Sequence, residues 1–367
     1  MSIVRGWCPT AHRPMAAGDG LIVRVRPRLA RLERAQVLGL CDAASTHGNG
    51  QIDLTNRGNL QIRGVSDNTW PALIKDLCGL GLVDPDPAME ARHAVLVAPD
   101  WRWGDDTHSI ASDVIARLAD FPDLPGKFGF AIDAGASPVL RDDPADIRIE
   151  RGGHGGLILR ADGRATGVRI TPDDAVAAMI ALAEWFVASG GVTAGRMARH
   201  AAPLPDWARG DALPAASVPM LVDGAQGLGA VHGVAFGRIA ARELAALMTP
   251  DTRALRITPW RRVIVEGGTA PTTPEPVGIA VDACVGAPDC PQASVETRAL
   301  ALRLAPHLAG RLHVSGCAKG CARSRPADVV LTGRDGCFDV AFGARAGDPP
   351  VLSGFGPARI FAHFGVS

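Results

Sequence analysis

Four cysteines in two pairs near the C-terminal end of the chain have the spacing of ligands to an iron centre. Five residues separate Cys284 from Cys290, and three residues separate Cys317 from Cys321. A [4Fe–4S] cluster is held by four cysteine thiolates. Two loops that each carry a pair of thiolates can meet around one such cluster. The spacing therefore predicts an iron–sulfur cluster bound by these four residues in a redox protein.

The residues around the cysteines favour loops that approach a cluster closely. Gly286 and Pro288 interrupt the chain inside the first pair, and Gly316, Ala318 and Gly320 surround the second pair. Small residues keep side chains away and leave backbone N–H groups free to bond sulfides. Zinc is an alternative, but its paired ligands are usually separated by two to four residues. Four cysteines that are unrelated in space are the other alternative.

Composition limits the class of protein. A chain of 367 residues exceeds the size of one hydrophobic core, so two or more packed units are expected. Its 38 basic and 38 acidic residues cancel, which excludes a general nucleic-acid-binding surface. The start of the chain has no secretory h-region, and no apolar run reaches about 20 residues. We therefore expect a soluble cytoplasmic protein with neither nucleic-acid nor membrane partners. In that reducing compartment the cysteines outside the two pairs are expected to be free thiols: Cys8, Cys41, Cys78 and Cys337.

The chain contains an internal repeat. Two stretches, starting at Gly18 and Gly224, each show an apolar segment, a helical pattern, a strand ending in Thr, a turn with Arg and a second strand. The predicted helices are Leu29–Ser45 and Gly237–Met248. The predicted strands are Gln51–Thr55 and Leu60–Val65 in the first copy, and Ala254–Thr258 and Arg262–Glu266 in the second.

A second kind of segment follows each copy, with a strand, a helix, another strand and a hairpin. The predicted elements before the hairpins are His93–Pro99, Ser109–Asp120 and Phe128–Asp133 in the first half, and Val277–Cys284, Ser294–Leu308 and Arg311–Ser315 in the second. The Pro- and Ala-rich stretch His200–Ser217 separates the halves. If each repeat copy is called an A-type segment and each segment that follows it a B-type segment, their order along the chain is A-B-A′-B′. This order suggests pseudo-two-fold symmetry with a pocket at the interface of the halves.

Several motifs resemble the sulfite and nitrite reductase family, which binds sirohaem and a [4Fe–4S] cluster. They are the cysteine pattern, LTNRGNLQIRG (Leu54–Gly64), LPGKF (Leu124–Phe128) and RITPW (Arg256–Trp260). The resemblance extends from about Gly18 to Phe364. It implies an α+β fold in which a ferredoxin-like half-domain and an α/β domain occur twice. The expected segments are 12–70, 88–200, 218–269 and 275–365, the last carrying the cluster.

The resemblance also implies roles for individual residues. The family's Thr-x-Arg-x-x-x-Gln stretch, which binds tetrapyrroles, falls on Thr55, Arg57 and Gln61. Catalytic cations are implied at Arg57, Arg92 and Lys127, and further cofactor-binding cations at Arg63 and Lys319. In the strand Leu60–Val65, alternation directs Gln61 and Arg63 away from the core. From the residues alone, a solvated edge strand and surface lysines remain alternatives.

One branch of the family fits best. The segments RGWCPTAHRPMAAGDGLIVRVRP and GRLHVSGCAKGCARS resemble the precorrin-3B synthases. That branch implies an oxygen-dependent mono-oxygenase that hydroxylates precorrin-3A and closes a lactone in aerobic cobalamin biosynthesis. Gly129 stands where the reductases carry the second lysine of Lys-x-Lys, which weakens an anion pocket for sulfite or nitrite. Precorrins carry eight carboxylates, which arginine binds well through its forked geometry.

The branch further implies a mononuclear non-haem iron beside the cluster. No His-x-Asp/Glu pair identifies its ligands, and a tetrapyrrole can itself supply them. GAQGLGAVHG (Gly224–Gly233) fails the dinucleotide-binding spacing, so electrons are expected from an external NAD(P)H-dependent reductase or a ferredoxin. Two alternatives stay open: a sirohaem-dependent sulfite or nitrite reductase, and a non-catalytic protein that relays electrons.

Overall fold

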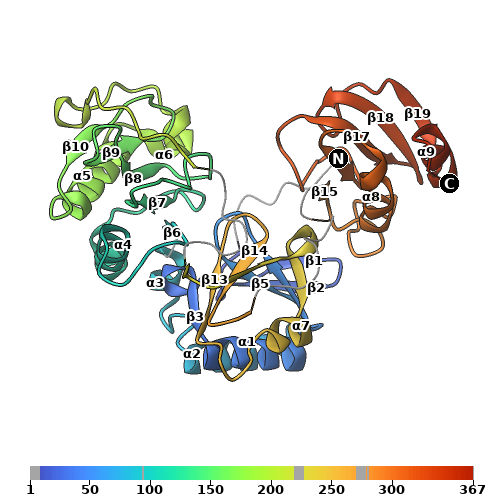
Figure 1. The fold of residues 1–367 in the computed structure, drawn as a ribbon, viewed down its shortest axis with the longest axis horizontal. Coiled ribbons are helices and arrows are strands. Elements are labelled where there is room, and N and C mark those ends of the chain that lie inside the picture. Colours follow the sequence, from blue (N-terminus) through green and yellow to red (C-terminus); the bar gives the residue numbers. More distant parts are fainter. Residues whose placement is uncertain (1–8, 93–94, 219–226, 270–277, 279–280, 367) are drawn as a thin grey trace.

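The computed structural model describes residues 9–92, 95–218, 227–269, 278 and 281–366. The chain forms a central unit and two outer lobes, which stand on either side of a gap in Figure 1. Both copies of the A-type repeat lie in the central unit, and each B-type segment forms one outer lobe. The predicted α+β class with a duplicated architecture is confirmed.

The central unit contains two sheets backed by helices. Its first-half elements are β1 (Met15–Ala17), β2 (Gly20–Val25), β3 (Arg31–Glu33), α1 (Arg34–His47), β4 (Gln51–Leu54), β5 (Leu60–Val65) and α2 (Trp70–Gly79). Its second-half elements are β11 (Ala230–Gly233), β12 (Arg238–Ala240), α7 (Ala241–Ala246), β13 (Ala254–Ile257) and β14 (Arg262–Glu266). The sheet orders are β1-β2-β5-β4-β12 and β11-β14-β13-β3. Leu60 and Ile62 are buried in the shared core, as the alternation predicted.

The two copies exchange a strand. β12 of the second copy pairs antiparallel with β4 of the first, and β3 of the first copy pairs antiparallel with β13 of the second. The predicted helix starts at Leu29 and Gly237 are therefore wrong. In both places a left-handed residue, Leu29 at φ 54° and Phe236 at φ 54°, leads into a short strand before the helix begins. Because the core includes apolar residues from both copies, the central unit is a single body.

Ion pairs hold both exchanged strands in place. In each case an arginine on the exchanged strand binds a carboxylate of the sheet that the strand joins. Glu266 of β14 accepts hydrogen bonds from Arg31 of β3 at 3.0 and 2.9 Å and from Arg256 of β13 at 2.6 Å. On the other side, Asp53 of β4 accepts from Arg238 of β12 at 2.6 and 3.1 Å. Asp53 also pairs with Arg63 of β5 at 3.6 Å. Each of these two carboxylates thus joins an arginine of its own sheet to one that arrives from the other half.

The outer lobes share one topology. The first lobe holds α3 (Pro87–Arg92), β6 (Val95–Val97), α4 (Asp106–Ala116), β7 (Phe130–Asp133), β8 (Ile147–Arg151), β9 (Leu157–Ala161), β10 (Val168–Ile170), α5 (Ala175–Ala188) and α6 (Gly191–Ala194). The second holds β15 (Asp282–Ala283), α8 (Arg298–Leu304), β16 (Leu312–Ser315), β17 (Ala327–Arg334), β18 (Cys337–Ala344), β19 (Leu352–Phe355) and α9 (Pro357–His363). In each sheet three parallel strands are followed by two antiparallel ones.

Three details bear on the sequence predictions. Residues 93–94, 277 and 279–280, at the starts of two predicted strands, lie outside the described residues. The predicted boundary His200–Ser217 forms two β-bridges with the first lobe, Gly152 to Pro214 and Gly167 to Ala212. No helix in the described ranges is long and apolar enough to cross a membrane.

We predict that Glu266→Gln destabilises the protein by about 3–5 kcal/mol, because it leaves the buried Arg256 without its carboxylate and removes one of the two carboxylates that hold Arg31. The hydrogen bonds from Arg31 and Arg256 outweigh the effect of burial and hold the pKa of Glu266 below its ordinary 4.5. Its stabilisation is therefore present above pH 4.5 and is lost as the pH falls through the folded-state pKa. Urea unfolding at several pH values measures both effects.

The control is Glu33→Gln, which removes the other, exposed partner of Arg31. An exposed ion pair contributes about 0–1 kcal/mol. Equal losses of stability in the two variants would contradict a special role for Glu266.

Candidate functional site

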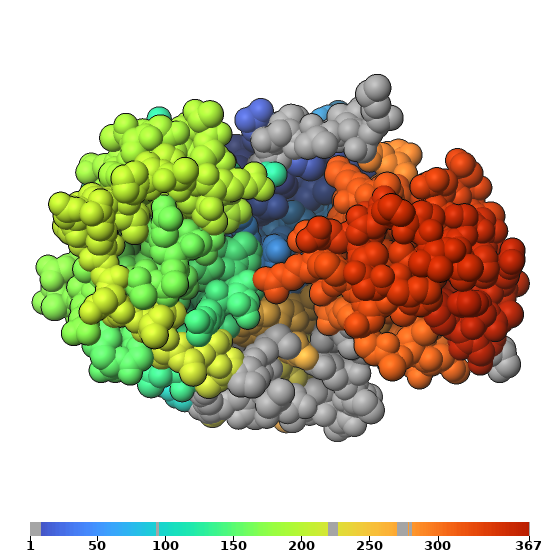
Figure 2. Space-filling view, turned by 90° about the horizontal axis from the view of Figure 1, so that it is seen from above, coloured from blue at the N-terminus to red at the C-terminus, as the bar shows by residue number. Residues whose placement is uncertain are grey.

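A cleft of about 1080 Å³ lies between the two outer lobes, over the central unit. Figure 2 shows the hollow between the first lobe and the second, with the central unit at its base. Residues 139–144 line it from the first lobe, residues 259–262 from the central unit, and residues 322–325 from the second lobe. All three parts of the fold therefore contribute to one site.

The walls of the cleft are rich in arginine. Seven arginines and three aspartates are among its lining residues: Arg141, Arg148, Arg261, Arg262, Arg311, Arg323, Arg325, Asp142, Asp143 and Asp162. None of these arginines was among the predicted site residues. A signal was available, because RDDPAD (141–146) and RSRPAD (323–328) occupy equivalent positions of the two lobes, after β7 and after β16.

Asp282 of β15 organises three of the arginines. Its carboxylate is buried and lies 2.7 Å from Arg261, 2.9 Å from Arg311 and 3.3 Å from Arg323. Burial alone would raise the pKa of Asp282, but the hydrogen bond from Arg311 and the charges of Arg261 and Arg311 outweigh burial and lower it. Arg261 has a left-handed φ of 58°, a conformation that costs a non-glycine residue energy. The ion pair with Asp282 holds this strained residue at the cleft.

Asp143 presents a carboxyl group that can hold a proton near neutral pH. Burial raises its pKa to about 6, although the hydrogen bond from Trp260 and the charge of Arg148 oppose the rise. The Trp260 Nε1–H donates to this carboxylate at 3.0 Å. Both side chains line the cleft.

The four predicted cysteines come together at one side of the second lobe. The Gly316 N–H donates to Cys284 Sγ at 3.1 Å, which joins the second loop to the first. Burial raises the pKa of the Cys321 thiol; Lys319 opposes this rise, and the charges of Cys284, Cys317 and Cys290 add to it. All three other thiols are thus near enough to act on Cys321.

The donor set fits a cluster better than a single ion. Within the described ranges, no three His, Cys, Asp or Glu side chains are close enough to hold one metal ion. A structural zinc site needs four ligands around one ion, whereas a [4Fe–4S] cluster spreads four thiolates over its irons. Two described residues near the loops have buried side-chain nitrogens without a hydrogen-bond partner. These atoms are both ring nitrogens of His313 and Nε of Arg298. A negatively charged cluster suits such surroundings.

The first lobe has no thiolates at the matching positions. The two lobes can be aligned residue by residue through their strands. The Ala98 N–H donates to the Ile132 carbonyl oxygen in the first lobe, as the Cys284 N–H donates to the Val314 carbonyl oxygen in the second, so Ala98 corresponds to Cys284. Counting on from the aligned strands β7 and β16, Gly135 corresponds to Cys317 and Val139 to Cys321. These first-lobe positions are small or apolar. Ala98 and Val139 pack with Leu96, Leu140 and Trp260 in a small hydrophobic cluster. Among the described residues of the two lobes, thiols therefore occupy these matched positions in the second lobe and not in the first.

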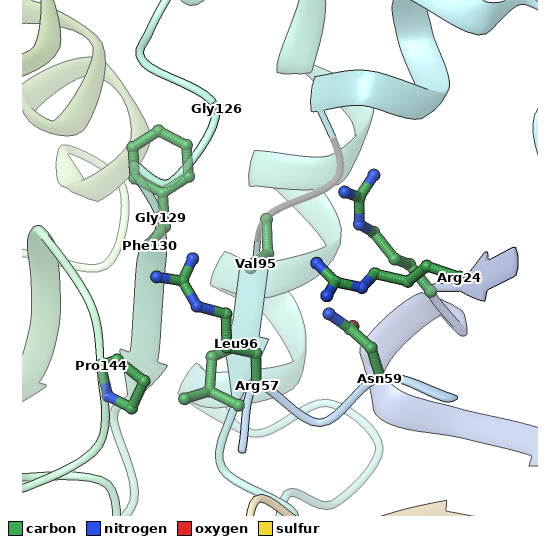
Figure 3. A pocket seen from close by; sticks show the side chains of 10 residues that line it. Arg24, Arg57, Asn59, Val95, Leu96, Gly126, Gly129, Phe130 and Pro144 are labelled. Carbon is green, nitrogen blue, oxygen red and sulfur yellow. The ribbon is translucent and has the colours of Figure 1, made fainter. Parts of the chain in front are cut away.

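The predicted cations Arg57 and Lys127 meet at a smaller pocket next to the cleft. Arg57 Nη2 donates to the Lys127 carbonyl oxygen at 3.0 Å, while the Lys127 side chain is exposed. Arg24, Arg26 and Arg57 line this pocket, and Figure 3 shows Arg57 and Arg24 on either side of Val95. Pro144 lines both the pocket and the cleft.

Arg63 and Arg92 are held by other groups in the structure. The Arg63 guanidinium is buried and donates to Asp19 at 3.0 Å from Nε. Arg92 donates to the Phe121 carbonyl oxygen at 2.6 Å and to Asp123 at 2.7 Å. Their direct binding of a ligand stays a prediction, and the structure does not bring either of them to the cleft lining.

The other predicted site residues have distinct surroundings. Thr55 Oγ1 accepts from the N–H groups of Arg57 at 3.3 Å and Asn59 at 3.2 Å, which shapes the turn that carries Arg57. Gln61 lies on the strand face opposite the core, paired in register with Asp53. Lys319 is exposed between the two cysteines of its loop.

Comparison with known proteins confirms the resemblance seen in the sequence. Residues 13–79 match the nitrite/sulfite reductase ferredoxin-like half domain. A precorrin-3B synthase of Sinorhizobium sp is 28% identical, over 95% of this chain and 85% of that protein. A ferredoxin–nitrite reductase of Synechococcus elongatus is 23% identical, over 89% and 78%. The structure of the Mycobacterium tuberculosis NirA protein matches with a TM-score of 0.56 at 18% identity, over 92% of this chain and 76% of that one. The fold is thus shared with NirA, and the full-length relatives are oxidoreductase-type enzymes.

We predict that Cys317→Ser removes the cluster absorbance at roughly 400 nm, because each of the four thiolates is needed to hold the cluster. Anaerobic purification followed by visible spectroscopy and iron and sulfide analysis measures the loss. Cys337→Ser is the control, since Cys337 is a free thiol in β18 outside both loops. Full iron and sulfide content in Cys317→Ser would refute the ligand assignment.

Proposed function

We propose that this chain is a precorrin-3B synthase, an oxygen-dependent mono-oxygenase. Its reaction would hydroxylate precorrin-3A and close a lactone before ring contraction in aerobic cobalamin biosynthesis. The observation that carries the proposal is the arginine-lined cleft whose wall includes the residues that directly follow Cys321. The similarity to a precorrin-3B synthase over 95% of the chain supports the choice of substrate.

The cleft suits a large ring with many carboxylates. Its volume of about 1080 Å³ is large enough for a tetrapyrrole, and ligand pockets are usually about 300–1,000 Å³. Arg141 and Arg325 are exposed on opposite lobes, and Arg325 Nη2 lies 3.5 Å from the Asp142 carbonyl oxygen, next to Arg141. Their guanidinium groups therefore lie near each other across the cleft, where both can fork onto carboxylates of a bound ring. Arg148 is paired with Asp162 at 3.1 Å, and this pair gives the wall a fixed shape.

Cys284, Cys290, Cys317 and Cys321 are the residues that would hold the [4Fe–4S] cluster. When bound, such a cluster transfers single electrons. Ala322 and Arg323 directly follow Cys321 and line the cleft, so the thiolate loop adjoins the ring-binding wall. Electrons would come from an external NAD(P)H-dependent reductase or a ferredoxin, with O2 as the second substrate. The described residues offer no three His, Cys, Asp or Glu side chains for a mononuclear iron, so that iron does not fit a site of protein ligands in this part of the chain.

A sirohaem-dependent nitrite or sulfite reductase is the second candidate. The similarity to a ferredoxin–nitrite reductase over 89% of the chain favours it. Gly129 argues against it, because this residue lines the small pocket beside Arg57 where the reductase motif has a second lysine. With one cation fewer, the pocket is less suited to holding and protonating a small anion.

Turnover with isotopically labelled O2 separates the candidates. Anaerobically purified protein is supplied with precorrin-3A, a reductant and labelled O2, and the product is analysed by mass spectrometry. We expect one labelled oxygen atom in the macrocycle. A sirohaem Soret band with nitrite or sulfite turnover would support the reductase instead. An intact cluster without oxygen incorporation would support an electron relay.

We predict that Arg141→Met weakens binding of a polycarboxylate porphyrin, such as uroporphyrin, at least about tenfold, because a charged hydrogen bond contributes about 1.5–3 kcal/mol. Fluorescence titration measures the dissociation constant. Arg169→Met is the matched control, since Arg169 is exposed on β10 and is absent from the cleft lining. Equal affinities of the two variants would exclude Arg141 from the binding site.

A further inference from the structure

We propose that the half-buried Arg298 acts as the counter-charge of the iron–sulfur cluster and raises its reduction potential. Arg298 is not one of the predicted site residues and does not line the cleft. The inference rests on the cluster of the proposed function and concerns what this chain contributes to its redox behaviour.

The start of α8 is attached to the first cysteine loop. Arg298 is the first residue of α8 and directly follows Thr297. The Thr297 hydroxyl donates to the Cys284 carbonyl oxygen at 2.6 Å. The loop also packs tightly on this threonine, because a Cβ added to Gly286 would lie 2.7 Å from Thr297 Oγ1. The backbone of Arg298 is therefore fixed beside a cluster ligand.

Within the part of the chain that the structure describes, no carboxylate forms an ion pair with Arg298. Its Nε is buried without a hydrogen-bond partner, and its guanidinium lies 5.6 Å from the centre of the Phe236 ring. The nearby carboxylate of Asp53 is already bound by Arg238 and paired with Arg63. An isolated buried charge is costly, so this guanidinium is suited to an anion that the protein alone does not supply.

The charges that act on Arg298 come mainly from the central unit, and Cys284 of the first cysteine loop adds to them. Burial and the charge of Arg238 lower its pKa to about 10, so the group stays protonated at neutral pH. Asp53 and the Cys284 thiol act in the opposite direction and favour the charged form. Four thiolates around a cluster provide far more negative charge than one thiol. Since net charge helps to set cluster potentials, a fixed cation here stabilises the reduced form.

A purely structural role is the plain alternative. The contact with Phe236, in the central unit, would then serve to hold the second lobe in place. The two roles differ in what the Arg298→Met substitution changes. If Arg298 has only a structural role, its loss lowers the stability of the protein with or without the cluster. If it is a counter-charge, its loss changes the reduction potential of the cluster and lowers the stability of the cluster-bound form alone.

The first experiment is a redox titration of the cluster, followed by electron paramagnetic resonance. At the wild-type midpoint we expect the ratio of reduced to oxidised cluster to be about tenfold lower in Arg298→Met, a shift of about 59 mV for a one-electron couple. Arg298→Lys should stay near the wild type. Arg303→Met, on the same helix with its guanidinium 3.8 Å from the Phe361 ring centre, should leave the potential unchanged. An unshifted potential in Arg298→Met with full iron and sulfide would overturn the inference.

The second experiment compares thermal unfolding of the cluster-free and cluster-bound proteins. Arg298→Met should leave the cluster-free protein as stable as wild type or more so, and should destabilise the cluster-bound protein. A loss of stability in both forms would overturn the inference in favour of the structural role. Absence of iron and sulfide from the wild type would instead overturn the cluster itself, and the inference with it.

Discussion

The exchange of β3 and β12 between the two copies of the repeat is the constraint on which the rest of the structure depends. Each sheet of the central unit is completed by a strand from the other copy. The carboxylates of Asp53 and Glu266 tie these strands in place through arginines from both sides. Because the copies cannot separate without breaking both sheets, the outer lobes that extend from them are held on opposite sides of one cleft.

The two outer lobes show how a duplicated fold acquires different roles. Their sheets have the same order and direction of strands, so equivalent residues can be matched through the register. At the positions of Cys284, Cys317 and Cys321 the first lobe has Ala98, Gly135 and Val139. A hydrophobic cluster of the first lobe includes two of these positions, and the second lobe keeps the thiolates. In the proposed function the second lobe would provide electron transfer, and both lobes provide walls of the cleft.

The arginines of this protein fall into groups according to how buried they are and which carboxylates bind them. Arg63 and Arg256 are buried and held by carboxylates, which makes them part of the scaffold. Arg261 is also held, but the same pairing fixes its strained backbone at the cleft. Arg141 and Arg325 are exposed on facing walls and are available to a ligand. Arg298 is half-buried, and among the described residues no carboxylate pairs with it. Burial combined with pairing therefore indicates the role of each cation.

The sequence alone determined the features that depend on neighbours along the chain. The spacing of the four cysteines, the repeat, and the hairpins that follow Thr55 and Thr258 could be predicted because loops, periodicity and turns are local properties. Tertiary structure alone decided the strand exchange, the tie of Arg63 to Asp19, the arginines of the cleft and the isolation of Arg298. These depend on which distant segments meet, and one arginine in a sequence looks like another until its partner in space is known.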